Sequence, residues 1–160
     1  IYTNQYRNNL IKNICNNFNN NSLILVNHLA HGDALYDILL ECNDKQVFFV
    51  KGEVEVEERD RVKKIMETNN NVICIAMTSI FSTGINIKNI HMIMFASGGK
   101  SFIRTIQSIG RGLRLNENKD KLVIIDFADK LKYGERHGDK RKEIYLQENI
   151  PFKTTEIVEK

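Results

Sequence analysis

The stretch Leu23-Ile24-Leu25-Val26 is an unbroken apolar run that stops at the polar pair Asn27-His28. A strand with one face in water alternates apolar and polar residues, so an unbroken run indicates a strand buried on both faces. Segments with helical spacing separate this run from four others of the same kind, at residues 47–50, 72–76, 90–95 and 122–126. The pattern predicts an α/β domain with three layers, a parallel β-sheet flanked by helices on both faces.

Polar or glycine-containing segments follow each predicted strand. In a parallel sheet the functional loops gather at the carboxyl ends of the strands, which lie along one edge. Topology alone therefore gives a set of candidate site residues: Asn27-His28, Lys51-Gly52, the segment from Thr78, the segment from Ser97, and Asp126.

Length and composition describe one ordinary globular domain. The chain has 160 residues, 42% of them apolar and 27% charged, and a net charge of 23 − 20 = +3 that permits an anionic partner without requiring one. Its three cysteines are widely spaced with no CxxC pair, which argues against a disulfide framework or a zinc site and favours a reducing cytoplasm. There is no apolar run of about 18 residues and no signal-peptide pattern, so no membrane association is expected.

The flanking segments differ from the strand-rich centre. Apolar residues every four positions predict a helix within residues 2–18, and the first residue is not methionine, so we expect a piece of a longer protein. We divide the chain into an amino-terminal helix (1–21), the α/β domain (22–129) and a basic helix and tail (130–160). A stripe of His137, Arg141 and Tyr145 in the last part fits either a packing face or a DNA contact.

The run Gln107-Ser108-Ile109-Gly110-Arg111-Gly112-Leu113-Arg114 is the strongest chemical signal. On a helix its two arginines share a face, where their planar donor groups can hold phosphate oxygens. A solvated basic face is the alternative. A merely solvated helix has little reason to carry the two glycines, since each costs ~1 kcal/mol relative to alanine.

A second segment, Thr78 to Asn86, combines short hydroxyl side chains with Gly84 at the end of a predicted strand. Such residues let a backbone approach phosphate oxygens, although an ordinary capped turn has the same composition. Two other patterns carry less weight. Gly98-Gly99-Lys100-Ser101 lacks the first P-loop glycine, because Met94 stands there, and His28-x-x-His31 has no further metal ligand near it.

Gln107-x-x-Gly110-Arg111-x-x-Arg114 resembles motif VI of superfamily 2 helicases and translocases, and residues 78–86 resemble their motif V. Asn27-His28 resembles motif IV, and Lys51-Gly52 with Glu58-Arg59 resembles motif IVa. The resemblance covers residues 22–127 with the motifs in order. It implies the second RecA-like domain of such a motor, most similar to phage recombination and repair helicases of the UvsW type.

The resemblance implies specific roles. Arg114 is the expected arginine finger toward the γ-phosphate of ATP, with Arg111 beside it and Gln107 coupling nucleotide to the domain interface. The expected nucleotide-binding residues are Gly84, Asn86 and Gly110. Many relatives have aspartate where Asn86 stands, which puts a ribose-binding or metal-linked role of this residue in doubt. The expected contacts to the nucleic-acid backbone are Thr78, Asn27, His28, Lys51, Gly52 and Lys100.

The groups that cradle the β-phosphate and hold Mg²⁺ are missing from this chain. The resemblance therefore implies that ATP and Mg²⁺ are bound mainly by a preceding RecA-like domain, and that this chain alone does not hydrolyse ATP. DNA is the expected partner, with RNA left open, and the cytoplasm is the expected location, that of the host for a phage protein. Two alternatives remain: a non-catalytic nucleic-acid-binding module that keeps the fold, and a stand-alone nucleotide switch.

Overall fold

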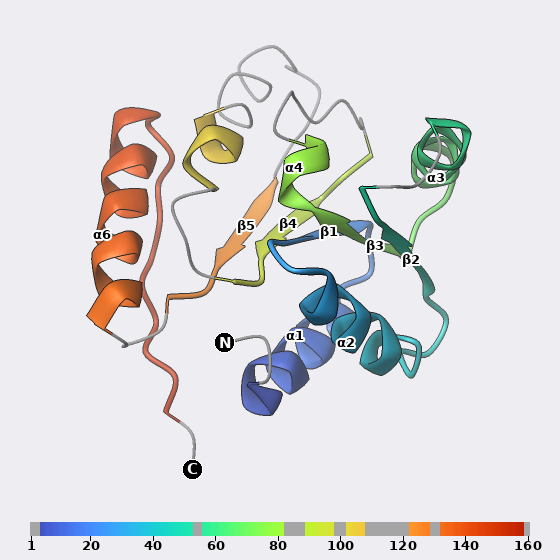
Figure 1. Cartoon of the computed structure of the whole chain (residues 1–160), viewed down its shortest axis with the longest axis horizontal. Coiled ribbons are helices and arrows are strands. Elements are labelled where there is room, and N and C mark those ends of the chain that lie inside the picture. Colours follow the sequence, from blue (N-terminus) through green and yellow to red (C-terminus); the bar gives the residue numbers. More distant parts are fainter. Residues whose placement is uncertain are drawn as a thin grey trace.

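The computed structural model describes residues 4–52, 56–81, 89–97, 102–107, 122–128 and 132–158, and it confirms the predicted fold (Figure 1). Five parallel strands form one sheet in the order β2-β3-β1-β4-β5. The strands are β1 (Ser22–Val26), β2 (Gln46–Val50), β3 (Val72–Met77), β4 (Met92–Phe95) and β5 (Val123–Asp126). Each of the five predicted strands is therefore present in the structure.

Helices cover both faces of the sheet. They are α1 (Gln5–Asn17), α2 (Leu29–Leu39), α3 (Val56–Thr68), the short α4 (Thr78–Phe81) and α6 (Lys132–Gln147), and residues 102–107 are also helical. In Figure 1, α1 and α2 lie together on one side of the sheet, while α6 stands beside β5. None of the helices in the described segments combines the length and apolar character needed to cross a bilayer.

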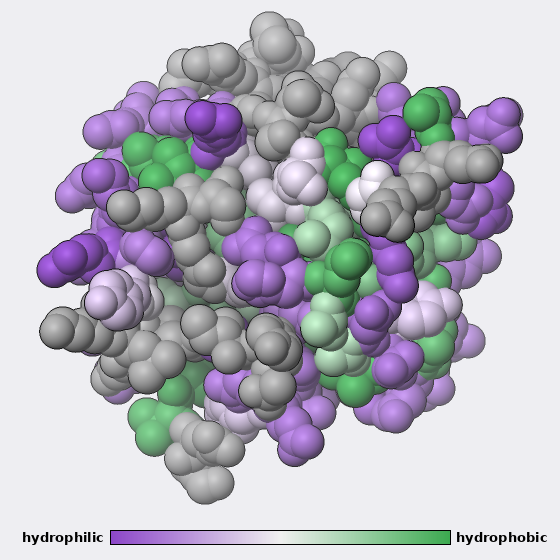
Figure 2. Space-filling view, viewed as in Figure 1, coloured by the Kyte–Doolittle hydropathy of each residue, from purple (hydrophilic) through white to green (hydrophobic). Residues whose placement is uncertain are grey.

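Alternate residues of each strand enter two separate cores, which explains why the strand sequences do not alternate. In β1, Leu23 and Leu25 join the core under α3, residues 102–107 and α6, whereas Ile24 and Val26 join the core under α1 and α2. All four side chains are completely buried. On the surface seen in Figure 2, hydrophilic side chains surround small apolar patches.

Helix α1 is present as predicted, and Ile14 and Phe18 of the predicted stripe pack against the core, but the most buried residues lie one position further along the chain. The expected stripe through Leu10 and Ile14 is only half-buried, whereas Ile11 and Cys15 are completely buried. The buried stripe begins with Arg7, whose guanidinium Nη1 donates to the carbonyl of Ala96 at 3.4 Å. Hydrophobic periodicity cannot find a buried face that starts with a charged residue.

Asn21 organises the amino edge of the sheet. Its side chain is completely buried, and its Nδ2 lies 2.7, 2.8 and 2.9 Å from the carbonyl oxygens of Met66, Asn69 and Asn89. Its Oδ1 accepts a hydrogen bond from the backbone N–H of Val72 at 2.9 Å. One side chain thus joins the start of β1 to the ends of the segments that lead into β3 and β4.

All three cysteines are buried free thiols. Cys15 and Cys42 lie in the core under α1 and α2, and Cys74 lies in the opposite core. Burial raises the pKa of the Cys15 and Cys74 thiols to about 12, with nearby Cys42 adding to the shift at Cys15. These thiols are therefore protonated and inert in the folded chain.

Candidate functional site

The carboxyl ends of the five strands meet at one edge, as the topology predicted. Leu25 of β1 is level with Ala76 of β3 and Phe95 of β4, and Phe95 is level with Asp126 of β5. The segments that follow these strands start side by side although they are up to about a hundred residues apart in the chain. The edge therefore collects most of the candidate residues that the structure describes.

Thr78 joins two of these strand ends. Its Oγ1 lies 3.0 Å from the carbonyl oxygen of Val26 and 3.0 Å from Oδ1 of Asn27, and the residue is only 5% exposed. A hydroxyl can donate one hydrogen at a time, so these two oxygens share it. The hydroxyl links β1 to β3, and the predicted contact of Thr78 with nucleic acid stays a prediction.

His28 opens helix α2 at the same edge. It is the N-cap residue, with extended backbone (φ −129°, ψ 135°), and its carbonyl accepts the first helical hydrogen bond from Gly32 N at 3.1 Å. The imidazole is exposed. The amino end of a helix has positive potential, so an anion beside His28 is favoured electrostatically.

Lys51 and Gly52 follow β2 and face solvent. The Lys51 ammonium lies 2.8 Å from Oδ1 of Asp33 and 5.1 Å from the centroid of the Phe49 ring. An exposed ion pair contributes only about 0–1 kcal/mol, so Lys51 can exchange this carboxylate for a phosphate at little cost. A Cβ added at Gly52 would meet nothing within 4 Å, whereas one added at Gly32 would lie 2.1 Å from the Phe49 ring.

Gln107 is the last described residue of the helical segment 102–107 and is half-buried. This helix is held firmly, because Ile106 is completely buried and the ring of Phe102 lies 4.6 Å from that of Phe95, centroid to centroid. Gln107 thus stands where the glycine–arginine run begins. The other predicted residues of the nucleotide site, together with Lys100, lie outside the described residues: Gly84, Asn86, Gly110, Arg111 and Arg114.

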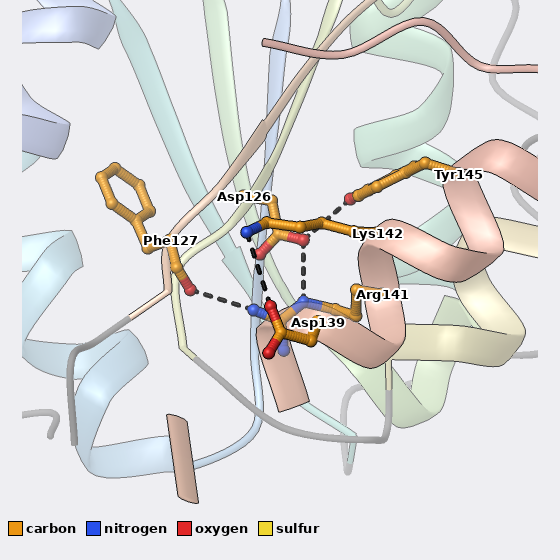
Figure 3. A network of polar contacts seen from close by, with 6 residues as sticks. All are labelled: Asp126, Phe127, Asp139, Arg141, Lys142 and Tyr145. Carbon is orange, nitrogen blue, oxygen red and sulfur yellow. Dashed lines mark hydrogen bonds and ion pairs between the residues drawn. The ribbon is translucent and has the colours of Figure 1, made fainter. Parts of the chain in front are cut away.

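Asp126, at the carboxyl end of β5, is bound by two side chains of α6 (Figure 3). Arg141 Nε donates to Asp126 Oδ2 at 2.7 Å, and the Tyr145 hydroxyl donates to the same oxygen at 2.9 Å. Arg141 Nη2 also donates to the carbonyl of Phe127 at 3.2 Å. Of the two interpretations of the α6 stripe, the packing face is confirmed for Arg141 and Tyr145.

Burial sets the protonation of two groups near this edge. It raises the pKa of the Tyr145 phenol, and the adjacent Asp126 carboxylate raises it further, so the hydroxyl remains a donor. Burial also lowers the pKa of His31 to about 4, with the Arg7 guanidinium as the next cause. Neutral His31 contacts Oδ1 of Asn8 through Nε2 at 3.2 Å. Across the described segments, no three potential metal ligands cluster together.

Sequence reasoning missed two buried polar residues, Arg7 and Asn21. Arg7 reaches the carboxyl edge at Ala96 from the opposite end of the chain, and Asn21 lies in an asparagine-rich tract that resembled a simple linker. The only signal available was position, since Asn21 directly precedes a predicted strand. Both side chains bind backbone groups, which leave no trace in a sequence pattern.

Residues 5–116 of the chain match the family of the helicase conserved C-terminal domain. The chain belongs to this family. This helicase C-terminal domain is 38% identical over 109 residues to the ATP-dependent DNA helicase uvsW of Enterobacteria phage T4, covering 68% of the chain and 22% of that protein. It is 34% identical over 99 residues to the putative ATP-dependent helicase IRC3 of Saccharomyces cerevisiae, covering 61% of the chain and 14% of that protein.

Solved structures agree with this assignment. The crystal structure of T4 UvsW superposes with a TM-score of 0.70 at 32% identity, over 89% of this chain and 32% of that one. S. cerevisiae Dbp5 bound to RNA and ADP BeF3 superposes with a TM-score of 0.63 at 17% identity, over 91% and 36%, and shows the fold alone. The predictions of a RecA-like fold, superfamily 2 and similarity to the UvsW type are confirmed.

The helicase C-terminal domain spans 22% or less of the length of the curated relatives that it matches. The family match begins at the first residue of α1, a helix that contributes Ile11 and Cys15 to a core of the domain. The division of the chain at residues 21 and 129 stays a prediction.

Proposed function

We propose that this chain is the second motor domain of an ATP-dependent DNA helicase or translocase. It would supply an arginine finger and part of the track for the DNA backbone. The observation that supports the proposal is the carboxyl edge of the sheet, where Asn27-His28 follows β1 and Lys51-Gly52 follows β2, two strands whose ends are both level with the end of β3. The T4 relative, named as an ATP-dependent DNA helicase, supports it.

In this proposal the two arginines act on a nucleotide that another domain binds. Arg114 approaches the γ-phosphate and meets the charge that grows in the transition state, with Arg111 beside it and Gln107 linking the nucleotide to the domain interface. Gly84, Asn86 and Gly110 complete the proposed set of nucleotide-binding residues. A preceding RecA-like domain provides the P-loop and the Mg²⁺ that neutralises the phosphates, because this sequence has no complete P-loop.

The DNA backbone would cross the exposed part of the edge. Lys51 can release Asp33 for a phosphate, Gly52 leaves room for close approach, and the amino end of α2 at His28 favours an anion. Asn27 and Lys100 complete the proposed track, and the buried Thr78 hydroxyl supports it from within through its hydrogen bond to Asn27 Oδ1. Contacts of this kind hold the strand without reading its bases. RNA is the alternative nucleic acid, since the Dbp5 neighbour was solved with RNA. The proposed place of action is the cytoplasm.

The decisive experiment replaces Arg114 by alanine in the full-length protein and measures DNA-stimulated ATP hydrolysis. Loss of an arginine finger lowers turnover by roughly 10³-fold, while binding of DNA persists. Arg104→Ala is the matched control, because Arg104 is exposed on the helix of residues 102–107 and has no assigned role. Normal turnover of Arg114→Ala would remove the finger assignment. A full-length protein that binds DNA without any ATPase activity would favour the non-catalytic module instead.

A further inference from the structure

The ring of Phe49 lies directly against the backbone of Gly32. A Cβ added at Gly32 would lie 2.1 Å from Cζ of this ring and 2.6 and 2.7 Å from its two Cε atoms. Helix α2 packs against β2, so the ring is held between its own strand and the helix. The absence of a side chain at residue 32 therefore sets where the Phe49 ring can lie.

The ring and the next residue of α2 hold the Lys51 side chain. The ammonium lies 5.1 Å from the centroid of the Phe49 ring, within the range of a cation–π contact, and 2.8 Å from Oδ1 of Asp33. A lysine side chain is long and flexible, and two contacts from neighbouring points restrict it to one orientation. The ammonium is therefore already positioned before any ligand arrives, which lowers the entropy cost of binding one.

The Asp33 carboxylate stands where a phosphate oxygen would bind. Both groups are anionic oxygen ligands, and both approach an ammonium to about 2.7–2.9 Å. The side chains of Lys51 and Asp33 are 46% and 56% exposed, so a strand in solvent can reach the pair. A phosphate that contacts Lys51 is repelled by the adjacent carboxylate, and the ion pair must open for a full contact to form.

We propose that Asp33 competes with the nucleic-acid phosphate for Lys51, and that Gly32 and Phe49 are positioning residues that hold the ammonium for either anion. This role rests on the motor function and the DNA track proposed above. Such a competitor weakens one contact of the track and speeds its release. A translocating motor has to break each backbone contact that it makes, so an exchangeable contact suits this purpose.

The first test measures the affinity of the full-length protein for a fluorescently labelled single-stranded DNA by anisotropy, without nucleotide. Asp33→Asn removes the competing charge and should tighten binding about two- to fivefold at low salt, with a smaller gain as the salt concentration rises. Asp37→Asn is the matched control, because it makes the same charge change at an exposed position one helical turn away. Unchanged affinity in Asp33→Asn would overturn the inference, and so would an equal gain in both variants.

A double-mutant cycle tests whether Asp33 acts through Lys51. Lys51→Ala should weaken binding about tenfold at low salt, the equivalent of one charged hydrogen bond. If Asp33 competes for the ammonium, Asp33→Asn has no further effect once Lys51 is alanine. A gain of the same size in the Lys51→Ala background would show simple repulsion between Asp33 and DNA and would overturn the competition.

The positioning role of the ring is tested by Phe49→Leu. Leucine keeps an apolar side chain beside Gly32 and loses the cation–π contact, so DNA affinity should fall about two- to fivefold. Phe49 is half-buried, and the measurement is made below the unfolding temperature of the variant. Wild-type affinity in folded Phe49→Leu would overturn the positioning role. If this variant does not fold, the exposed Asp33 and Lys51 variants still decide the competition.

The two levels of the proposal fail differently. Wild-type DNA affinity in Lys51→Ala would remove Lys51 from the proposed track and leave nothing for Asp33 to compete for. Weak binding by Lys51→Ala together with wild-type binding by Asp33→Asn would keep the track and reject only the competition.

Discussion

The two edges of the sheet use polar residues in opposite ways. At the amino edge, the Asn21 amide is surrounded by backbone partners at 2.7–2.9 Å and is completely buried. At the carboxyl edge, Lys51 pairs with Asp33 on the surface, and the buried Ser97 Oγ and Asp126 Oδ1 have no hydrogen-bond partner. At the amino edge, Ser22 Oγ is also a buried side-chain oxygen without a hydrogen-bond partner.

This difference separates stability from function within one small domain. Polar groups whose bonds are all internal stabilise the fold and cannot bind anything else. Exposed or incompletely bonded groups stabilise less but remain available to a phosphate or a partner domain. Substitutions at the amino edge should therefore change the free energy of unfolding and leave catalysis intact. Substitutions of exposed residues at the carboxyl edge should lower activity or DNA affinity and leave the free energy of unfolding nearly unchanged.

Asn21→Ala should have the largest effect on stability. It removes the side-chain partner of the Val72 N–H and of the Asn89 carbonyl, whereas the carbonyls of Met66 and Asn69 keep the Asn89 amide. The loss should lower the free energy of unfolding by about 3 to 5 kcal/mol. Urea denaturation measures this loss, and Asn20→Ala, one residue away and exposed, is the control. A loss below that of an ordinary surface substitution would mean that the amino edge is not the stabilising one.

The next effect is the loss of stability in acid caused by His31. Its folded pKa of about 4 lies below its ordinary value of 6.5, so the neutral form is favoured by folding. The contribution is fully present above pH 6.5 and is lost as the pH falls toward 4, by about 3 kcal/mol at most. His31→Gln keeps a donor for Asn8 without titrating, so its stability should change less over this range. Parallel pH profiles for both proteins would contradict the assignment.

Thr78→Val should have a smaller effect. The substitution removes the hydroxyl that links Val26 and Asn27, and a single buried hydrogen bond of this kind contributes about 1 kcal/mol. DNA affinity should stay unchanged because the hydroxyl points inward, and Thr155→Val in the exposed tail is the control. A clear loss of DNA affinity would instead support the phosphate contact that the sequence predicts for Thr78.

Gly52→Ala should change stability least, by less than about 1 kcal/mol, because the added methyl group meets nothing in the chain. If a phosphate approaches the backbone here, DNA affinity should fall about tenfold, the equivalent of one charged hydrogen bond. Gly32→Ala gives the opposite result, since its methyl group collides with the Phe49 ring and destabilises α2 on the sheet. Equal DNA affinities for Gly52→Ala and the wild type would remove Gly52 from the proposed track.

The strands were predictable because burial on both faces leaves an unbroken apolar run, and the candidate edge followed from parallel topology. The strand order β2-β3-β1-β4-β5 was not predictable in the same way, since it depends on where each crossover packs rather than on local pattern. Hydrophobic spacing also found only one margin of the buried face of α1, because Arg7 and Asn8 are buried despite their polarity.

A site residue could be predicted only where its own position in the sequence, directly after a strand, was enough to identify it. Lys51, Gly52 and His28 could be assigned to the edge from their position after a strand. The contact between Asp126 and Arg141 could not, because a buried pair is a property of two elements and appears in the sequence as two ordinary charged residues. Motif resemblance pointed to the chemistry, and the structure showed which side chains hold the elements beside it.

The three buried thiols allow the opening of each face of the sheet to be measured by thiol modification. Cys15 and Cys42 are covered by α1 and α2, while Cys74 is covered from the opposite side. A thiol reagent modifies each sulfur only when its own layer opens, since the thiolate is scarce at a pKa of about 12 in the closed state of Cys15 and Cys74. The modification rates of Cys15 and Cys42 therefore report the opening of the layer of α1 and α2, and the rate of Cys74 reports the opening of the opposite layer.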